Sequence, residues 1–438
     1  MGTSSSKDVQ GKPVVLIVGG GYAGVFVAKL LDKNGDFNVV IIDRKNYFLH
    51  NIGLLRGCAV EGWEARCTVP YTKVLKYGSI VQGEVESIAE DGKSITVHGY
   101  DKPIKCDYMV VCTGSSYAFP CKVAEADKKN VAAKYQALRK SVKEAKSVCV
   151  VGGGAVGIEL SGEIAYHFPD TQVTLVHSGE TLLSSTDHSA KFKQAALTSL
   201  QSFKNMKVLL GQKVKNESLD KKALQAGATT FIEGHQTLET TKGNKMEADV
   251  TFFCIGTKVN NRSFAKTLTI DAQGRLEVNE FLQVKGLERA FSIGDCASIE
   301  GKMGYFAKFQ AQNVAKNIHA MEKKKKLTPY KKAEPAMILP TGPKGGCSEI
   351  KGLVLGNFLT RNIKSADLFC SVYWGELNQK VNKPQEEATE QRMKKSQLSL
   401  EAAMGMTAEE IKAIQEKGLG SEKKVKFIAM CRTKRTES

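Results

Sequence analysis

The chain has 438 residues, of which 42% are hydrophobic and 25% charged, a composition typical of a soluble globular protein with two or three domains. No apolar run reaches the roughly 18 residues needed to cross a bilayer, and the N-terminus lacks the apolar core of a signal peptide. The 11 cysteines show no C-x-x-C motif, zinc-ligand spacing or disulfide framework. We therefore expect reduced, buried thiols in a cytosolic protein, and no metal centre.

A first glycine motif follows the first apolar segment. Val14–Val18 predicts a buried strand, and Gly19, Gly21 and Gly24 then form G-x-G-x-x-G. In such a motif the first glycine allows a tight turn, the second lets a pyrophosphate approach the backbone, and the third lets helix and strand pack closely. Free N–H groups at the helix N-terminus then hold the anion, because the helix dipole favours negative charge there.

The residues after this motif complete a dinucleotide-binding unit. A helical stretch runs to Lys33, the pair Asn34-Gly35 is typical of a helix C-cap, and a second apolar strand ends at Asp43. At that position a carboxylate accepts a hydrogen bond from a ribose hydroxyl. A bare G-x-G-x-x-G is weak evidence, but strand, helix, second strand and terminal acid are all in register here. The sequence therefore predicts dinucleotide binding.

The second half of the chain repeats this plan. A strand over Ser147–Val151 is followed by Gly152, Gly154 and Gly157, then by a helix and by a strand that ends at Val176. The same glycine spacing after a strand predicts a second phosphate-binding turn.

Each unit also closes in the same way, with a buried strand that ends in glycine. In the first unit the strand from Asp107 leads to Thr113 and Gly114, and in the second the strand from Asp249 leads to Gly256. An internal repeat of this size indicates two nucleotide-binding domains. Two such domains in one chain suit a protein that holds a bound redox cofactor and receives electrons from a diffusing one.

The two units differ at one chemically important position. Where the first unit has Asp43, the second has His177 and Ser178, with no carboxylate. An acid there would select NADH by binding the 2′-hydroxyl and repelling a 2′-phosphate, so its absence leaves both NADH and NADPH admissible. A protonated His177 would assist a phosphate, and the alternative is a polar strand terminator.

A later segment resembles the far wall of a cofactor pocket. Residues from Leu276 to Ala297 predict a strand, a short loop and a second strand over Ala290–Ile293, followed by Gly294 and Asp295. A helix is expected from about Tyr305, which places its N-terminus just beyond this acid. The alternative interpretation is an ordinary Gly-Asp turn.

Two features bear on membrane binding. The start Met-Gly-Thr-Ser-Ser-Ser fits the pattern for N-myristoylation at Gly2, and the alternative is a disordered polar leader. A single myristoyl chain binds a membrane only marginally. Residues 301–438 are basic, with 26 Lys and Arg against 14 Asp and Glu and a continuous run at Lys323–Lys326. Such a basic patch would supply a second membrane-attachment signal. It would equally suit nucleic acid or a solvated face.

Several motifs together carry a resemblance to a known family. They are the N-terminal M-G-x-x-x-S, YFLHN after the first acid, VGGGAVGIELSGEI, VTLVHS, SIGDCA and LTRNIKSADLFCSVYW. With these, residues 13–376 resemble the apoptosis-inducing-factor homologues of the ferroptosis suppressor protein type, which belong to the two-dinucleotide-binding-domain flavoprotein reductases. Members are FAD-containing, NAD(P)H-dependent reductases of ubiquinone and related quinones that work at membrane and lipid-droplet surfaces.

The resemblance implies an α/β fold with two Rossmann-like dinucleotide-binding domains, a small α+β C-terminal domain and a polar tail. Domain boundaries follow from it: FAD binding over 13–117 and 258–329, NAD(P)H binding over 118–257, a C-terminal domain over 330–383, and a basic, partly helical tail over 384–438. The family pattern ends soon after Trp374, so the tail, with one expected helix at Thr407–Lys417, departs from it.

The resemblance also assigns roles to residues. Glu159 matches an acid near the nicotinamide and the flavin, and Lys364 matches a lysine close to the flavin ring; on sequence alone both are ordinary surface residues. The nicotinamide nucleotide would lie on the second glycine motif. The FAD residues that it implies are Gly19, Gly21, Gly24, Asp43, Thr113, Gly114, Asp295 and the helix start at Tyr305.

The expected activity is hydride transfer from NAD(P)H to FAD and transfer of two electrons to a quinone, by a cytoplasmic protein at a membrane or lipid-droplet surface. A flavoprotein disulfide reductase is disfavoured, because Cys58 and Cys67 do not form the redox motif it needs. Two alternatives stay open. One is a type II NADH dehydrogenase of a respiratory membrane, although no presequence is visible, and the other is a nucleic-acid-binding death effector.

Overall fold

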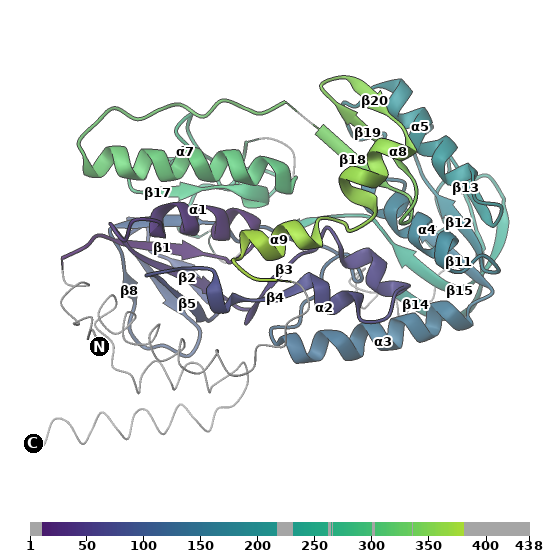
Figure 1. The fold of residues 1–438 in the computed structure, drawn as a ribbon, viewed down its shortest axis with the longest axis horizontal. Coiled ribbons are helices and arrows are strands. Elements are labelled where there is room, and N and C mark those ends of the chain that lie inside the picture. Colours follow the sequence, from purple (N-terminus) through teal and green to yellow (C-terminus); the bar gives the residue numbers. More distant parts are fainter. Residues whose placement is uncertain are drawn as a thin grey trace, which may run out of the picture.

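The computed structural model describes residues 11–216, 231–261, 264, 266–299, 303–334 and 336–380. Gly2, the predicted helix at Thr407–Lys417 and the rest of the tail lie outside these residues. Within them the fold is α/β, as the sequence predicts, with two five-stranded sheets and a smaller antiparallel sheet near the C-terminus (Figure 1). None of the helices in these ranges combines the length and the apolar character required to span a bilayer.

The first sheet carries the first glycine motif on its central strand. All its neighbouring strands pair in parallel. Buried aliphatic side chains explain this, because a strand covered on both faces contains an almost continuous apolar run. The strand order is β17 (Ala290–Ser292), β9 (Tyr108–Val111), β1 (Val14–Val18), β2 (Asn38–Asp43) and β5 (Ser79–Gln82).

Different elements cover the two faces of this sheet. Helix α1 (Tyr22–Asp32) and helix α7 (Gly304–Glu322) lie side by side over one face, where Phe26 and Val314 join a common apolar cluster (Figure 1). The other face packs against a small antiparallel sheet of β6 (Val85–Ile88), β7 (Ser94–Val97) and β8 (Ile104–Lys105).

The second sheet repeats the arrangement around the second glycine motif. Its strand order is β13 (Met206–Leu209), β12 (Gln172–Val176), β11 (Ser147–Val151), β15 (Lys245–Phe253) and β14 (Phe231–Glu239), and only β14 runs antiparallel to its neighbour. The helices of this half are α3 (Lys128–Glu144), α4 (Ala155–His167) and α5 (Ala190–Gln201).

The C-terminal segment lies between the two halves (Figure 1). Strands β18 (Ala336–Pro340), β19 (Gly346–Ile350) and β20 (Leu353–Leu355) form an antiparallel sheet. They are followed by α8 (Asn357–Thr360), a π-helical turn over Arg361–Ser365, and α9 (Cys370–Glu376). This agrees with the predicted small α+β domain.

Several shorter elements complete the fold. They are β3 (Tyr47–Leu49), the 3₁₀ turn η2 (Leu54–Cys58), α2 (Trp63–Cys67), β4 (Thr68–Pro70), the 3₁₀ turn η3 (Tyr71–Lys73), and the pair of β10 (Ser115–Ser116) with β16 (Lys258–Val259).

One predicted strand is wrong. The segment from Leu276 makes only isolated bridges, in which Leu276 pairs with Ile270 and Ala297, and Val278 pairs with Val284. Tight turns at Gly274 and Leu282, both with positive φ, reverse the chain too often for a continuous ladder. The following strand β17 forms as expected, and η6 (Gly294–Cys296) leads from it toward α7.

Candidate cofactor and nucleotide sites

The first glycine motif forms a turn that admits no side chain at two of its positions. Gly19 has φ +105°, and a β-carbon there would lie 2.5 Å from the carbonyl oxygen of Cys112. A β-carbon on Gly24 would lie 1.9 Å from the carbonyl oxygen of Gly19. Both positions therefore require glycine, because the backbone of Cys112, just after β9, or of the turn itself occupies the space.

Gly21 differs from these two glycines. A β-carbon there would meet no atom within 4 Å. It is the N-cap of α1, and no side chain caps the helix, so no side chain occupies the first N–H groups. An open position ahead of an uncapped helix N-terminus fits the pyrophosphate of a dinucleotide.

Asp43 lies beside this turn at the end of β2. Its Oδ2 accepts a hydrogen bond from the N–H of Gly20 at 2.5 Å, and its Oδ1 accepts one from the N–H of Lys45 at 2.7 Å. Burial raises the pKa of Asp43, and these two backbone N–H groups oppose the rise. Each carboxylate oxygen keeps a second lone pair, which fits the expected hydrogen bond from a ribose hydroxyl.

The second glycine motif has the same geometry. A β-carbon on Gly152, where φ is +117°, would lie 2.4 Å from the carbonyl oxygen of Cys254, and one on Gly157 would lie 1.8 Å from the carbonyl oxygen of Gly152. Gly154 again has no atom within 4 Å of such a carbon, and it precedes α4 without a side-chain cap. The molecule therefore has two glycine turns of the same construction, each a candidate phosphate cradle.

His177 occupies the structural place of Asp43 in the second half. Its Nδ1 accepts a hydrogen bond from the N–H of Gly153 at 3.1 Å, as Asp43 accepts one from Gly20. Its Nε2 lies 2.9 Å from the hydroxyl of Ser184. Burial lowers the pKa of His177, so the neutral imidazole neither attracts nor repels a 2′-phosphate.

Asp295 and the start of α7 lie next to the first cradle. A β-carbon on Gly294 would lie 3.2 Å from Cβ of Ala23 in the first turn of α1, and one on Gly304 would lie 3.6 Å from the ring of Tyr22. The hydroxyl of Ser115 donates to Asp295 Oδ2 at 2.6 Å. The predicted far wall is thus brought to the first cradle.

The other wall residues make contacts of their own. The hydroxyl of Thr113 donates to Asn261 at 2.8 Å, so this side chain is tied to the protein, while Gly114 takes a left-handed φ of +64°. Tyr305 is 47% exposed and packs edge-on against Phe309 of its own helix.

The structure brings together Lys364 and Glu159, the two residues that the resemblance places near the flavin and the nicotinamide. Lys364, in the π-helical turn, donates from Nζ to Glu159 Oε1 at 2.8 Å and to the carbonyl oxygen of Ile338 at 3.0 Å. Burial raises the pKa of Glu159, and Lys364 opposes this. The side chains are only 10% and 14% exposed, so neither is the surface residue that sequence alone suggests.

A second buried ion pair lies one helical turn further along α4, and sequence reasoning missed it. Arg56 donates to both carboxylate oxygens of Glu163, at 2.9 Å and 2.8 Å, with each side chain 2% exposed. Arg56 also donates to the carbonyl oxygens of Ser365 and Ala366. The signal was present, because two acids four residues apart on an otherwise apolar helix require buried cations. Together the two pairs join η2, α4 and the turn that carries Lys364.

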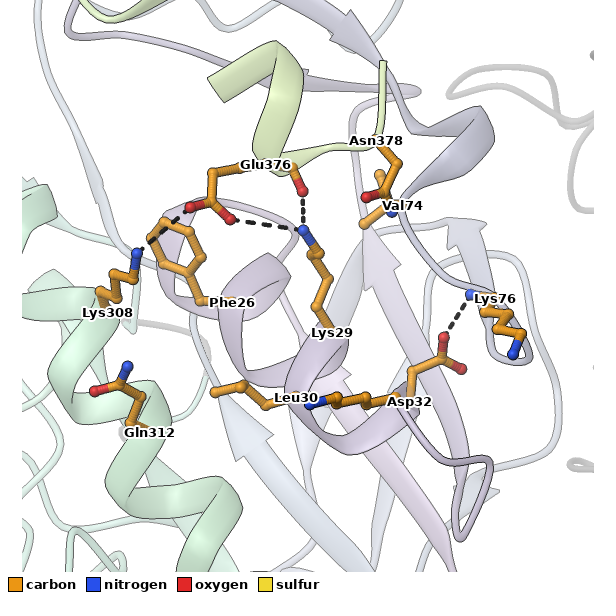
Figure 2. Close-up of a pocket in the computed structure, with 11 residues that line it drawn as sticks. Phe26, Lys29, Leu30, Asp32, Val74, Lys76, Lys308, Gln312, Glu376 and Asn378 are labelled. Carbon is orange, nitrogen blue, oxygen red and sulfur yellow. Dashed lines mark hydrogen bonds and ion pairs between the residues drawn. The ribbon is translucent and has the colours of Figure 1, made fainter. Parts of the chain in front are cut away.

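A groove of about 390 Å³ lies elsewhere (Figure 2). It is lined by Lys29 and Leu30 at the C-terminal end of α1, whereas the first cradle lies at the N-terminal end of that helix. Figure 2 shows Lys29 and Lys308 directed at Glu376, which pairs with both. This groove is therefore separate from the cradles, and its cations are partly neutralised.

Comparison with known proteins agrees with this geometry. The chain belongs to the pyridine nucleotide-disulphide oxidoreductase family, which it matches over residues 13–323. It is therefore an NAD(P)H-dependent flavoprotein oxidoreductase, with FAD as cofactor and NAD(P)H as co-substrate. The open positions at Gly21 and Gly154 fit these two ligands.

Two relatives and one solved structure are similar to this chain over most of its length. Apoptosis-inducing factor homolog B of Dictyostelium discoideum is 34% identical over 390 residues, covering 84% of this chain and 97% of the relative. Ferroptosis suppressor protein 1 of Xenopus tropicalis is 30% identical over 370 residues, covering 83% and 96%. Among solved structures, the sulfide:quinone oxidoreductase of Aquifex aeolicus superposes with a TM-score of 0.64 at 17% identity, covering 84% of this chain and 92% of that one.

Proposed function

We propose that this protein is an NAD(P)H:quinone reductase that works at a membrane or lipid-droplet surface. The observation that carries the proposal is the pair of uncapped phosphate cradles in one chain, together with a lysine–glutamate pair between the halves. The quinone acceptor is supported by the family resemblance and by the name of the Aquifex enzyme, which shares the fold. FAD held in the first cradle would supply the redox chemistry, which is hydride transfer from NAD(P)H and two-electron transfer to the quinone.

The residues of the chain contribute positioning and charge. The N–H groups after Gly21 would hold the FAD pyrophosphate, and Asp43 would accept a ribose hydroxyl. The N–H groups after Gly154 would hold the pyrophosphate of the diffusing nucleotide. Asp295, fixed by Ser115 beside the first cradle, would receive a hydroxyl of the ribityl or pyrophosphate region.

Lys364 is proposed to stabilise negative charge at the redox centre. An ammonium group has three N–H donors, and two of those of Lys364 are used by Glu159 and by the Ile338 carbonyl. The third is left to face a ligand. Since Lys364 and Glu159 are only 10% and 14% exposed, a charge placed beside them would be screened weakly by solvent. Glu159 would hold this ammonium in place.

Surface features support the membrane part of the proposal. Leu353, Phe358 and Leu359 of the C-terminal segment are 69%, 75% and 45% exposed, and the exposed Arg361 follows them. Lys323–Lys326 is also exposed, after α7. An apolar group followed by a cation, as at Phe358–Arg361, suits an anionic lipid surface, and the separate lysine run would add attraction to it. The N-myristoylation expected at Gly2 would add a second attachment.

One experiment tests the catalytic proposal. The purified full-length protein should show the visible absorption bands of a flavin and should oxidise NADH or NADPH when a short-chain quinone is added. A colourless, correctly folded preparation that takes up no added FAD would reject the proposal. Salt-sensitive DNA binding by a protein without NAD(P)H oxidation would favour the death-effector alternative.

The surface proposal has its own test. Flotation with vesicles that contain anionic lipid should fall severalfold for Phe358→Ser, relative to wild type. The matched control is Tyr77→Ser, which removes an aromatic side chain that is 47% exposed on the first half. Equal flotation of the two variants would exclude the C-terminal segment from the membrane contact. Flotation of protein made with N-myristoyltransferase, compared with protein made without it, measures the contribution of a myristoyl group at Gly2.

A further inference from the structure

Two cysteines from distant parts of the chain lie against the same glycine. A β-carbon on Gly53 would lie 2.9 Å from Sγ of Cys67, 3.1 Å from the ring of His50 and 3.2 Å from Sγ of Cys370. All three side chains are fully buried. Because Gly53 has no side chain, the two thiols and the imidazole fill a single space. A search for dithiol motifs along the sequence cannot find this pair.

Contacts on both sides hold the two cysteines together. Cys67 ends α2 and Cys370 begins α9. The indole N–H of Trp374 donates to the carbonyl oxygen of Arg66 at 2.8 Å, and Arg66 forms an ion pair with Asp367. The residues that flank each cysteine are thus joined, which holds both thiols against Gly53.

The imidazole of His50 is fixed beside them. One ring nitrogen, Nε2, lies 2.7 Å from the carbonyl oxygen of Leu368, and the other, Nδ1, lies 2.9 Å from the hydroxyl of Tyr22. The ring also packs against Tyr373, with centroids 4.6 Å apart.

The two thiols have different electrostatic surroundings. A hydrogen bond with Cys67, followed by one with His50, holds the pKa of Cys370 below its ordinary value, although burial and Asp367 oppose this. Burial, and then the hydrogen bond with Cys370, raises the pKa of Cys67. The two thiols share a hydrogen bond that favours one thiolate in the pair, and the neighbouring His50 ring assigns it to Cys370, with Cys67 as the proton-bearing partner. Burial raises the pKa of Cys58 and Cys296 as well.

We propose that Cys67 and Cys370 are a redox-active thiol pair that a small hydroperoxide oxidises to a reversible disulfide. The Cys370 thiolate attacks a peroxide oxygen, the O–O bond breaks, and the departing oxygen leaves as an alcohol, or as water when the oxidant is hydrogen peroxide, after taking one proton. Cys370 is then a sulfenic acid. The sulfur of Cys67 attacks it, the S–O bond breaks, and water leaves with the proton of Cys67.

The electrons balance in this sequence. Two thiols give up two electrons and two protons, and one hydroperoxide is reduced to one alcohol and one water. Burial of both sulfurs restricts the oxidant to a small molecule and places Cys67, rather than a second oxidant, next to the sulfenic acid. The disulfide would join α2 of the first half to α9, six residues beyond Lys364. This inference is independent of the quinone reductase activity.

The test follows the thiols directly. The reduced full-length protein is treated with hydrogen peroxide, alkylated under denaturing conditions and mapped by peptide mass spectrometry. The expected result is the loss of two alkylatable thiols, recovered by dithiothreitol, and a Cys67–Cys370 cross-linked peptide that forms about tenfold faster than Cys58 is oxidised. Recovery of both cysteines as free thiols, or reaction of Cys58 at the same rate, would overturn the proposal.

Single variants separate the two roles. In Cys67→Ser, Cys370 should be trapped by dimedone as a sulfenic acid, whereas in Cys370→Ser the thiol of Cys67 should survive the same peroxide treatment. Cys58→Ser is the matched control, since it removes another buried thiol of the same region and should leave the cross-link intact. If a variant fails to fold, the wild-type peptide map still decides. Trapping of Cys67 in preference to Cys370 would contradict the assignment.

Discussion

The ammonium nitrogen of Lys364 lies 2.8 Å from a carboxylate oxygen of Glu159, so the C-terminal segment and helix α4 meet in a charged contact between the two halves. Both side chains are at least 85% shielded from solvent. Burial raises the pKa of Glu159, and the ammonium group of Lys364 opposes this rise.

Replacement of this lysine should therefore affect turnover more than cofactor retention. In Lys364→Ala, Glu159 loses its cation, so its pKa should rise further, and the proposed redox centre would lose a positive charge. We expect kcat with NADH and a quinone to fall about tenfold or more, while the ratio of flavin to protein absorbance stays that of wild type.

Arg361→Ala is the matched control for this variant. Arg361 lies in the same π-helical turn but is exposed, so its removal deletes one cation without touching Glu159. We expect near-normal kcat. Equal turnover in Lys364→Ala and wild type would remove Lys364 from the site.

The two open glycines should separate the two nucleotide sites. A methyl group at Gly154 meets no protein atom, so Gly154→Ala should fold, but the methyl would occupy the space of a bound pyrophosphate. We expect normal flavin content and a KM for NAD(P)H raised about tenfold, which corresponds to about 1.4 kcal/mol. Gly21→Ala should instead yield folded protein with little flavin.

Gly157→Ala is the contrast, because its β-carbon would lie 1.8 Å from a backbone oxygen. It should lower the melting temperature and the soluble yield, whereas Gly154→Ala should not. If Gly154→Ala lost its flavin while its KM for NAD(P)H stayed unchanged, the assignment would be reversed: FAD would belong to the second cradle and NAD(P)H to the first.

The sequence predicts the parts of this protein that follow from local pattern. Strand β1, the glycine turn and strand β2 obey short-range rules of apolar runs and permitted φ, so Val14–Val18 and Asn38–Asp43 form as expected. The segment from Leu276 fails, because its apolar residues support isolated bridges between turns rather than a strand. Pairing of that kind depends on neighbours far along the chain.

The contacts of the candidate site also depend on residues far apart in the chain, so local sequence pattern predicts them even less well. The lysine–glutamate contact was expected only as a shared neighbourhood, and its distance depends on packing of the C-terminal segment onto α4. The Arg56–Glu163 pair and the Cys67–Cys370 pair each join residues more than 100 positions apart. No spacing rule within a single sequence encodes such contacts, although an acid on an apolar helix face indicates that a buried cation must exist.

Nucleotide preference should depend on His177. A neutral imidazole after β12 does not repel a 2′-phosphate as a carboxylate would, so wild type should accept both NADH and NADPH. In His177→Asp, a carboxylate would accept the N–H of Gly153, as Asp43 accepts that of Gly20, and would repel the phosphate. The ratio of kcat/KM for NADH to that for NADPH should rise about tenfold or more. An unchanged ratio, with intact flavin content, would show that nucleotide choice is made elsewhere.

The stability of the protein in acid should depend partly on Glu163. Burial alone would raise the pKa of Glu163, but His167 and Arg56 bring it below its ordinary value of about 4.5. A carboxyl with a depressed pKa contributes stability above pH 4.5 that is lost as pH falls through its folded value. As the pH falls below 4.5, the melting temperature of Glu163→Gln should therefore fall less than that of wild type. If the melting temperatures of the variant and of wild type fell in parallel with pH, the lowered pKa of Glu163 would be contradicted.

The Arg56–Glu163 pair should show the asymmetry of buried charges. Arg56→Leu leaves the Glu163 carboxylate buried without its two guanidinium donors, and we expect the free energy of unfolding to fall by about 3–5 kcal/mol. The double variant Arg56→Leu, Glu163→Leu removes both charges, so it should recover most of that loss even though Arg56 no longer reaches the carbonyls of Ser365 and Ala366. Urea unfolding of wild type, both single variants and the double variant measures the coupling. If the double variant is as unstable as the sum of the singles, the pair is not coupled, and the contribution of Arg56 comes from its contacts with the turn that carries Lys364.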